Sequence, residues 1–124
     1  MDELKADIRG LARQNEDFRR EVITGPHSQV VLMSIEPGSE IGEEVHDDVD
    51  QVLVFVEGTG EAVLEGGTSG VEPGDLVFVP AGTRHNFLNR GDTALKLYTV
   101  YSPPEHPAGT VHHSKEEADA AEHH

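Results

Sequence analysis

The sequence predicts an all-β fold, a sandwich or barrel of short antiparallel strands. Seven runs rich in branched and aromatic residues follow residue 22 at close spacing, which is typical of strands. They lie at 30–35, 41–46, 51–57, 61–65, 76–80, 85–89 and 95–101. Glycine and proline separate them, and no helical pattern lies between consecutive runs. Strands joined without intervening helices favour antiparallel pairing.

Turn residues mark where these strands end. Pro37-Gly38 and Pro73-Gly74-Asp75 supply the fixed and positive φ values of tight turns, and Gly66-Gly67 suits a two-residue hairpin. The chain shows no internal repeat, so we expect one sheet-rich domain over residues 22–104.

The N-terminal residues 1–21 are predicted to form a helical extension. Leu4, Ile8 and Leu11 recur at spacings of four and three, which places them on one face of a helix within 2–20. Gly10 and Asn15 weaken this helix. We expect its narrow apolar face to pack on a larger body or on a partner subunit.

Residues 105–124 are predicted to be a polar C-terminal tail. Three prolines fall at 103, 104 and 107, so this part of the chain is expected to be extended and peripheral. Ser114, three residues before Glu117, is expected to cap a short final helix. His123 and His124 are not counted among the candidate site residues, because a purification tag also leaves a terminal histidine pair.

Composition excludes several classes of function. The 124 residues suit one domain, and the absence of cysteine excludes disulfides, thiolate metal sites and cysteine catalysis. The chain has 24 acidic and 9 scattered basic residues, for a net charge of −15. This charge disfavours binding to nucleic acids and to anionic membranes. No apolar run is long enough for a membrane span, and the start lacks the features of a secretory signal. We therefore expect an acidic cytoplasmic protein.

Four side chains of suitable chemistry are candidates for a common site. Glu44 and His46 are two residues apart in an expected strand, so they project from one face. Gln51 opens the next strand, and His85 follows the turn at 80–83. In a sheet that curls with these faces inward, a carboxylate, two imidazoles and an amide would converge.

These residues lie in patterns that resemble the two motifs of the cupin family. The first motif is matched by Gly38-x5-Glu44-x-His46-x4-Gln51-x6-Gly58, in which positions 44 and 51 are usually His and Glu. The second is matched at every fixed position by Gly74-x5-Pro80-x-Gly82-x2-His85-x3-Asn89. The 15 residues between Gly58 and Gly74 fit the short connection of small microbial cupins. The ending at 97–104 is also similar to single-domain cupins often labelled mannose-6-phosphate isomerase-like.

The resemblance implies a small jelly-roll β-barrel, with a short N-terminal helix and a metal in its mouth. By position, His46, His85, Glu44 and Gln51 would be the ligands. The carboxylate has moved from 51 to 44, so one negative charge is kept. Two imidazoles and a carboxylate suit Fe, with Mn, Ni or Zn as further candidates. Two alternatives stay open: a cupin that has lost its metal, and a Gln51 that hydrogen-bonds a metal-bound water instead of the ion.

The last predicted strand adds two tyrosines. Tyr98 and Tyr101 lie on opposite faces of it, so one of them is expected to reach the cavity and to orient a substrate or donate a proton. Simple packing is the alternative for both. We expect metal-dependent oxygenase or isomerase chemistry on a small-molecule substrate, in a homo-oligomer such as a homodimer. The rival interpretation is a non-catalytic cupin that binds or senses a small ligand.

Overall fold

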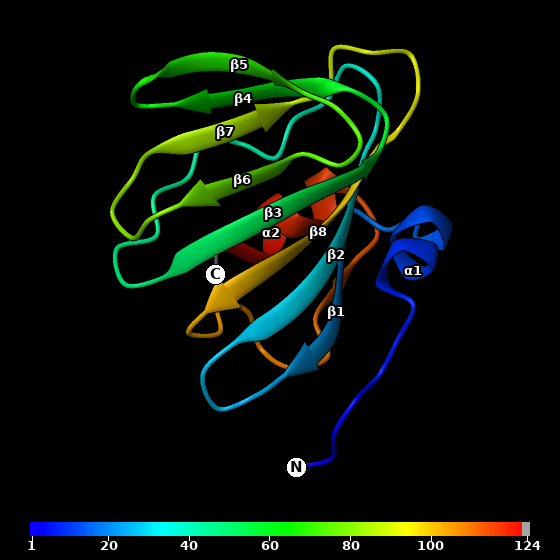
Figure 1. Ribbon diagram of the computed structural model, residues 1–124, viewed down its shortest axis with the longest axis vertical. Helices are drawn as coiled ribbons and strands as arrows, with labels where there is room; N and C mark the ends of the chain where they lie inside the picture. The colour runs from blue at the N-terminus through cyan, green and yellow to red at the C-terminus, as the bar shows by residue number, and fades with distance from the viewer. Residues whose placement is uncertain (123–124) are drawn as a thin grey trace.

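Two antiparallel sheets face each other in the computed structural model, which describes residues 1–122 (Figure 1). The large sheet has the strand order β6-β3-β8-β2-β1-β9, and the small sheet has the order β5-β4-β7. The elements in chain order are α1 (Ile8–Gln14), β1 (Arg19–Thr24), β2 (Gln29–Ile35), β3 (Asp50–Glu57), β4 (Gly60–Leu64), β5 (Gly67–Val71), β6 (Leu76–Val79), β7 (His85–Leu88), β8 (Leu95–Ser102), β9 (Val111–His112) and α2 (Lys115–Glu122). The predicted all-β fold is confirmed, and this arrangement is the one expected for a cupin jelly roll.

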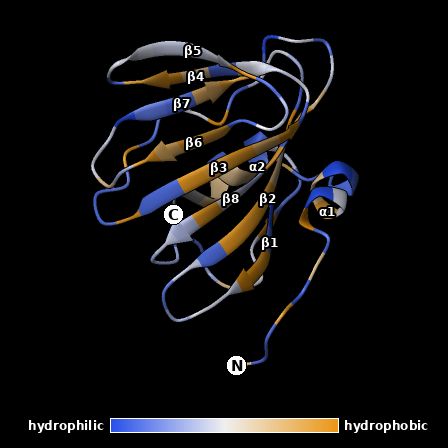
Figure 2. Ribbon diagram, in the orientation of Figure 1, coloured by the Kyte–Doolittle hydropathy of each residue, from blue (hydrophilic) through white to orange (hydrophobic). Residues whose placement is uncertain are grey.

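The core lies between the two sheets. Residues alternate between buried and less buried along β8, because successive side chains of a strand point to opposite faces. The inward set includes Leu53, Phe55, Phe87 and Leu97, each at most 1% exposed. Figure 2 shows the apolar character of β2, β3 and β8, the strands that carry most of this core. No helix among residues 1–122 has the length and apolar character to cross a membrane.

Strand register brings three polar side chains side by side at one end of the core. Tyr101 on β8 is paired with Gln29 on β2 and with Gln51 on β3. All three side chains are at most 2% exposed. This row forms one wall of the open end of the barrel, which we call the mouth and which also holds Glu44, His46 and His85.

The strand expected at 41–46 does not form, and this prediction was wrong. The segment makes two isolated bridges instead, Glu40 with Leu88 and Glu44 with His85. Gly42 has a φ of 108°, a conformation that breaks a regular strand, and its N–H donates to the Asn86 side chain. The bridge at Glu44 still aligns it with β7, through N–H···O=C bonds of 2.9 Å in both directions with His85.

The N-terminal helix is shorter than predicted. It spans Ile8–Gln14 within the expected 2–20, because the Asp7 side chain caps it by accepting from Gly10 N–H. The chain then enters β1 at Arg19, a strand that the sequence analysis did not expect. Ala12 packs α1 against Leu32 on the outer face of the large sheet.

The C-terminal residues add two elements to the barrel. Strand β9 pairs with β1, and Glu117 N–H donates to Ser114 Oγ at the start of α2, as the capping prediction requires. Ala118 of α2 is buried in the main core. The division at residues 21 and 104 stays a prediction, although β1 crosses the first boundary. His123 and His124 lie outside the described residues.

Candidate metal centre

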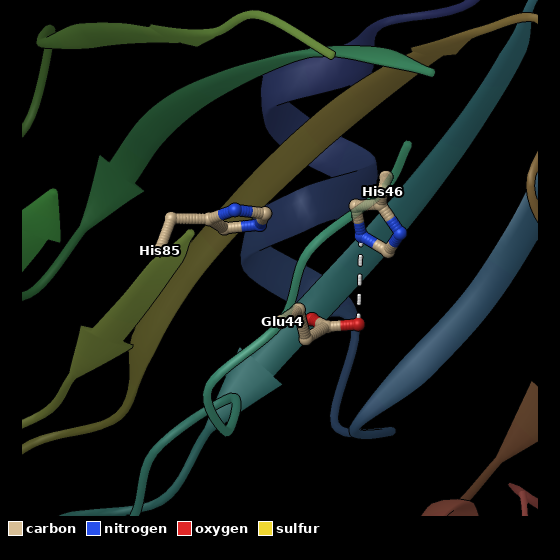
Figure 3. Close-up of side chains that lie close together, drawn as sticks. All are labelled: Glu44, His46 and His85. Carbon is tan, nitrogen blue, oxygen red and sulfur yellow. Dashed lines mark ion pairs between the residues drawn. The ribbon is translucent and has the colours of Figure 1, made fainter. Parts of the chain in front are cut away.

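Glu44, His46 and His85 meet at the mouth of the barrel (Figure 3). Each offers one ligand atom, and these atoms lie within 4.8 Å of one another. The Nε2 atom of His46 is 3.5 Å from Glu44 Oε2, and the two imidazole rings are 5.4 Å apart between centroids. The structure thus brings together three of the four predicted ligands at distances that one ion can span.

His85 is fixed in the tautomer that a metal requires. Its Nδ1 lies 2.9 Å from the Thr83 carbonyl oxygen, which can only accept, so Nδ1 carries the proton. The Nε2 atom is then a free acceptor, and it is buried without a hydrogen-bond partner. Burial lowers the pKa of His85, which favours the neutral, ligating ring.

His46 is held by a carboxylate on the side away from the other two ligands. Its Nδ1 is 3.3 Å from Glu105 Oε1, and Gly82 N–H donates to the His46 carbonyl oxygen. The interaction with Glu105, with a further contribution from Glu44, raises the pKa of His46 against the opposing effect of burial. In return, His46 lowers the pKa of Glu105. The His46 Nε2 atom is buried without a hydrogen-bond partner.

Gln51 presents its amide oxygen to the interior. Its Nε2 donates to Thr99 Oγ1 over 3.0 Å, and the Thr99 hydroxyl donates in turn to the Val52 carbonyl. This chain of hydrogen bonds orients the amide and leaves Gln51 Oε1 buried without a partner.

The two candidate tyrosines lie on opposite faces of the large sheet. Tyr101 is inside, with its ring centroid 6.0 Å from that of His46. Burial raises the pKa of its hydroxyl, which therefore stays protonated. Tyr98 is outside: it packs beside α1 and lines a cavity of about 340 Å³ between the N-terminal segment and the sheet. The structure does not bring Tyr98 to the site.

Sequence reasoning missed Arg19 and Glu105 as residues of the mouth. Arg19 falls in the range predicted as a helical extension, and Glu105 in the predicted tail. Glu105 reaches the mouth because Gln29 anchors its segment: Gln29 Oε1 accepts from the N–H groups of Glu105 and His106, and Gln29 Nε2 donates to the His106 carbonyl. These contacts join residues 76 or 77 positions apart, so no local pattern could reveal them.

Comparisons with known proteins show the family and the fold of this chain. Residues 31–101 match the family model described as the cupin domain. The uncharacterized protein YrkC of Bacillus subtilis is 44% identical over 124 residues, which cover 94% of this chain and 66% of that relative. A crystal structure from Bacillus halodurans superimposes with a TM-score of 0.93 at 41% identity, covering 94% of this chain and 93% of the other.

Some of the similar proteins have a stated activity, and a dioxygenase is among them. The acireductone dioxygenase of Parvibaculum lavamentivorans is 31% identical over 108 residues, which cover 77% of this chain and 58% of that enzyme.

Proposed function

Because this chain belongs to the cupin family, we propose that it is a metal-dependent cupin acting on a small polar molecule by oxygenase- or isomerase-type chemistry. Glu44, His46 and His85 would hold a divalent transition metal, and Gln51 would assist them.

The observation that carries this proposal is the position of the unsatisfied polar atoms. Among the described residues, the buried side-chain nitrogen and oxygen atoms without a hydrogen-bond partner are Arg19 Nε, His46 Nε2, Gln51 Oε1, His85 Nε2 and His106 Nε2. A buried polar atom without a partner costs about 1–3 kcal/mol. Three of these atoms belong to predicted ligands. Gln51 Oε1 and His85 Nε2 are acceptors, and His46 Nε2, which lies 3.5 Å from Glu44 Oε2, is one when its ring is neutral, so a cation would satisfy all three.

The chemistry of the three ligand side chains restricts which metal ions can bind. Two imidazoles with one carboxylate suit Fe(II), and Mn(II), Ni(II) and Zn(II) accept the same ligands. Such an ion supplies Lewis-acid polarisation of a bound carbonyl or carboxyl group, or carries dioxygen.

The remaining groups of the mouth would prepare the site. Glu105 and the Thr83 carbonyl hold the two imidazoles with Nε2 turned inward. The protonated Tyr101 hydroxyl can donate a hydrogen bond to a ligand oxygen. The apolar core around Phe55 and Phe87 excludes water from the inner side of the site. The similarity to a dioxygenase supports the oxygenase type.

Elemental analysis of the protein purified without a tag tests the metal. We expect about one transition-metal ion per chain, and its loss in His46→Ala and His85→Ala. His27→Ala is the matched control, because His27 is exposed on the turn between β1 and β2. Absence of metal from the wild-type protein, even after incubation with Fe(II), Mn(II), Ni(II) and Zn(II), would overturn the proposal.

Turnover is the second measurement. Oxygen uptake or isomerisation across a panel of sugars, keto acids and phenols is expected for the metal-loaded protein and not for His46→Ala. A loaded protein that binds panel members without converting any of them would instead be a ligand-binding or sensing cupin.

A further inference from the structure

A metal would leave two of the buried unpartnered atoms unexplained, Arg19 Nε and His106 Nε2. Both belong to side chains beside Tyr101. The Arg19 guanidinium lies close enough to Tyr101 to act on the pKa of its hydroxyl, and the rings of His106 and Tyr101 are 5.2 Å apart between centroids. These two atoms therefore belong to the same mouth as the proposed metal.

Arg19 is an unusual residue to find inside a barrel. Its side chain comes from β1 and is only 2% exposed. Its Nη1 lies 3.0 Å from His112 Nδ1, which must accept this bond because a guanidinium only donates, so the His112 ring is neutral. The guanidinium thus has a neutral hydrogen-bond partner in His112 and faces the Phe18 ring, whose centroid is 5.3 Å from its central carbon. Its nearest anionic groups are Glu44 and Glu105. Burial of a cation is costly unless an anion or strong acceptors face it.

Arg19 and Glu44 line one cavity. It has a volume of about 190 Å³, and its walls also include the apolar Ile41 and Ala118 and the charged Glu43, Lys115 and Asp119. This volume suits a small organic molecule. A ligand in this cavity would lie beside Arg19 and beside Glu44, one of the three proposed metal ligands.

From this arrangement we infer that Arg19 binds the carboxylate of the molecule on which the proposed metal centre acts. The substrate class is then a small carboxylic acid with a second oxygen beside the carboxylate, as in a 2-hydroxy or 2-oxo acid. The carboxylate would accept a hydrogen bond from the Nε–H group of Arg19, and the second oxygen would face the metal. This inference rests on the proposed function, and it names that site's substrate class.

A carboxylate ligand can bind in the mouth only if the negative charges of the neighbouring side chains are compensated. Glu44 and Glu105 are anionic neighbours that would repel a carboxylate. Glu105 is engaged by His46 at 3.3 Å, and Glu44 would be engaged by the metal. Arg19 supplies the positive charge that distinguishes an acid from a neutral molecule of the same size.

Glycolate and ethylene glycol are matched ligands for testing the role of Arg19, because glycolate carries a carboxylate where ethylene glycol carries a second alcohol group. Isothermal titration of each into the Zn(II)-loaded protein is expected to give at least tenfold tighter binding of glycolate. Arg19→Met should weaken glycolate binding tenfold or more without changing that of ethylene glycol. Arg90→Met is the control, since Arg90 is exposed and pairs with Glu61, and neither residue lines this cavity.

Glycolate binding that is as tight in Arg19→Met as in the wild-type protein would overturn the inference. If Arg19→Met does not fold, as judged by circular dichroism, Arg19→Lys decides, because lysine keeps the charge and removes Nε–H; unchanged glycolate affinity would again overturn it.

A Zn(II) titration of each variant separates the two proposals. Failure of the wild-type protein to bind Zn(II) or another of the four metals defeats the proposed function. Normal Zn(II) binding with no effect of Arg19 on glycolate defeats only the present inference.

Discussion

Glu105 holds His46 from behind, with Oε1 3.3 Å from Nδ1 of the imidazole. The two residues lie 59 positions apart, and the carboxylate belongs to the proline-rich segment after β8. A carboxylate on Nδ1 keeps the proton there and leaves Nε2 to accept a metal. Glu105 is therefore a positioning residue for the proposed centre.

Removal of this carboxylate should weaken metal binding. Glu105→Gln is expected to lower Zn(II) affinity about 10- to 100-fold, because outer partners of metal-bound histidines have effects of this size. Competition with a chromogenic chelator measures the affinity. Glu43→Gln, at an exposed carboxylate that pairs with Arg84, should bind Zn(II) like the wild-type protein. Equal affinities for all three proteins would show that Glu105 does not support the site.

Gln29 should matter for both stability and metal binding. Its buried amide makes the three hydrogen bonds that anchor residues 105 and 106 and a fourth to Thr24 Oγ1. Gln29→Leu leaves buried groups unpaired and is expected to lower the free energy of unfolding by about 3 kcal/mol. Urea denaturation of the metal-free protein measures this change.

The same variant should also bind Zn(II) more weakly, because Glu105 loses its anchor. Gln14→Leu is a suitable control, since Gln14 is exposed at the end of α1. A Gln29→Leu protein with wild-type stability would contradict the anchoring role.

His106 should make the metal-free protein sensitive to acid. Burial, with a contribution from Arg19, lowers the pKa of His106 from 6.5 to about 4. The unfolded chain takes up this proton below pH 6.5, whereas the folded protein takes it up only near pH 4, so stability falls as the pH drops through this window. At about 1.4 kcal/mol per pKa unit, the loss from this group is roughly 3 kcal/mol.

Unfolding curves at pH 7 and pH 4.5 test this dependence. His106→Gln should lose less stability than the wild-type protein between the two values. The charged or titratable neighbours of His106 are Arg19, His46, Tyr101, Glu105 and His112. They remain in both proteins, so the difference isolates His106. Identical losses would mean that His106 is protonated freely in the folded state.

The outer face of the large sheet supports the homodimer expected from the sequence, which we propose forms through this face. Phe78 and Leu76 of β6 are 52% and 61% exposed, and their partners on the neighbouring strand β3 are Val52 and Val54. Val52 is paired in turn with Val100 of β8, so an uncharged apolar row crosses three strands. In a chain with a net charge of −15, such a face is where two copies can approach with the least repulsion.

Analytical ultracentrifugation tests this interface. The wild-type protein should sediment as a dimer at micromolar concentration and Phe78→Glu as a monomer. Thr68→Glu, on the exposed strand β5 of the small sheet, should remain dimeric. A monomeric wild-type protein would show that this expectation is wrong.

Much of the fold could be predicted from local patterns of apolar and polar residues in the sequence. Strands with alternating apolar residues, such as β3 and β8, were predicted to within a residue, because a strand that buries one face carries that period in its own sequence. The local signal failed at 41–46, where the two-residue spacing of Glu44 and His46 resembled a strand. There the conformation of Gly42 overrides the pattern.

The candidate ligands could be named from the sequence because two family motifs carry them at fixed spacings, and the structure brings Glu44, His46 and His85 together. Their surroundings could not be predicted. Arg19 and Glu105 come from segments that local patterns assigned to the ends of the chain, and Gln29 directly precedes the strand predicted at 30–35. Only the tertiary structure decided their place, because strand pairing and hydrogen bonds between distant residues leave no periodic trace in the amino-acid sequence.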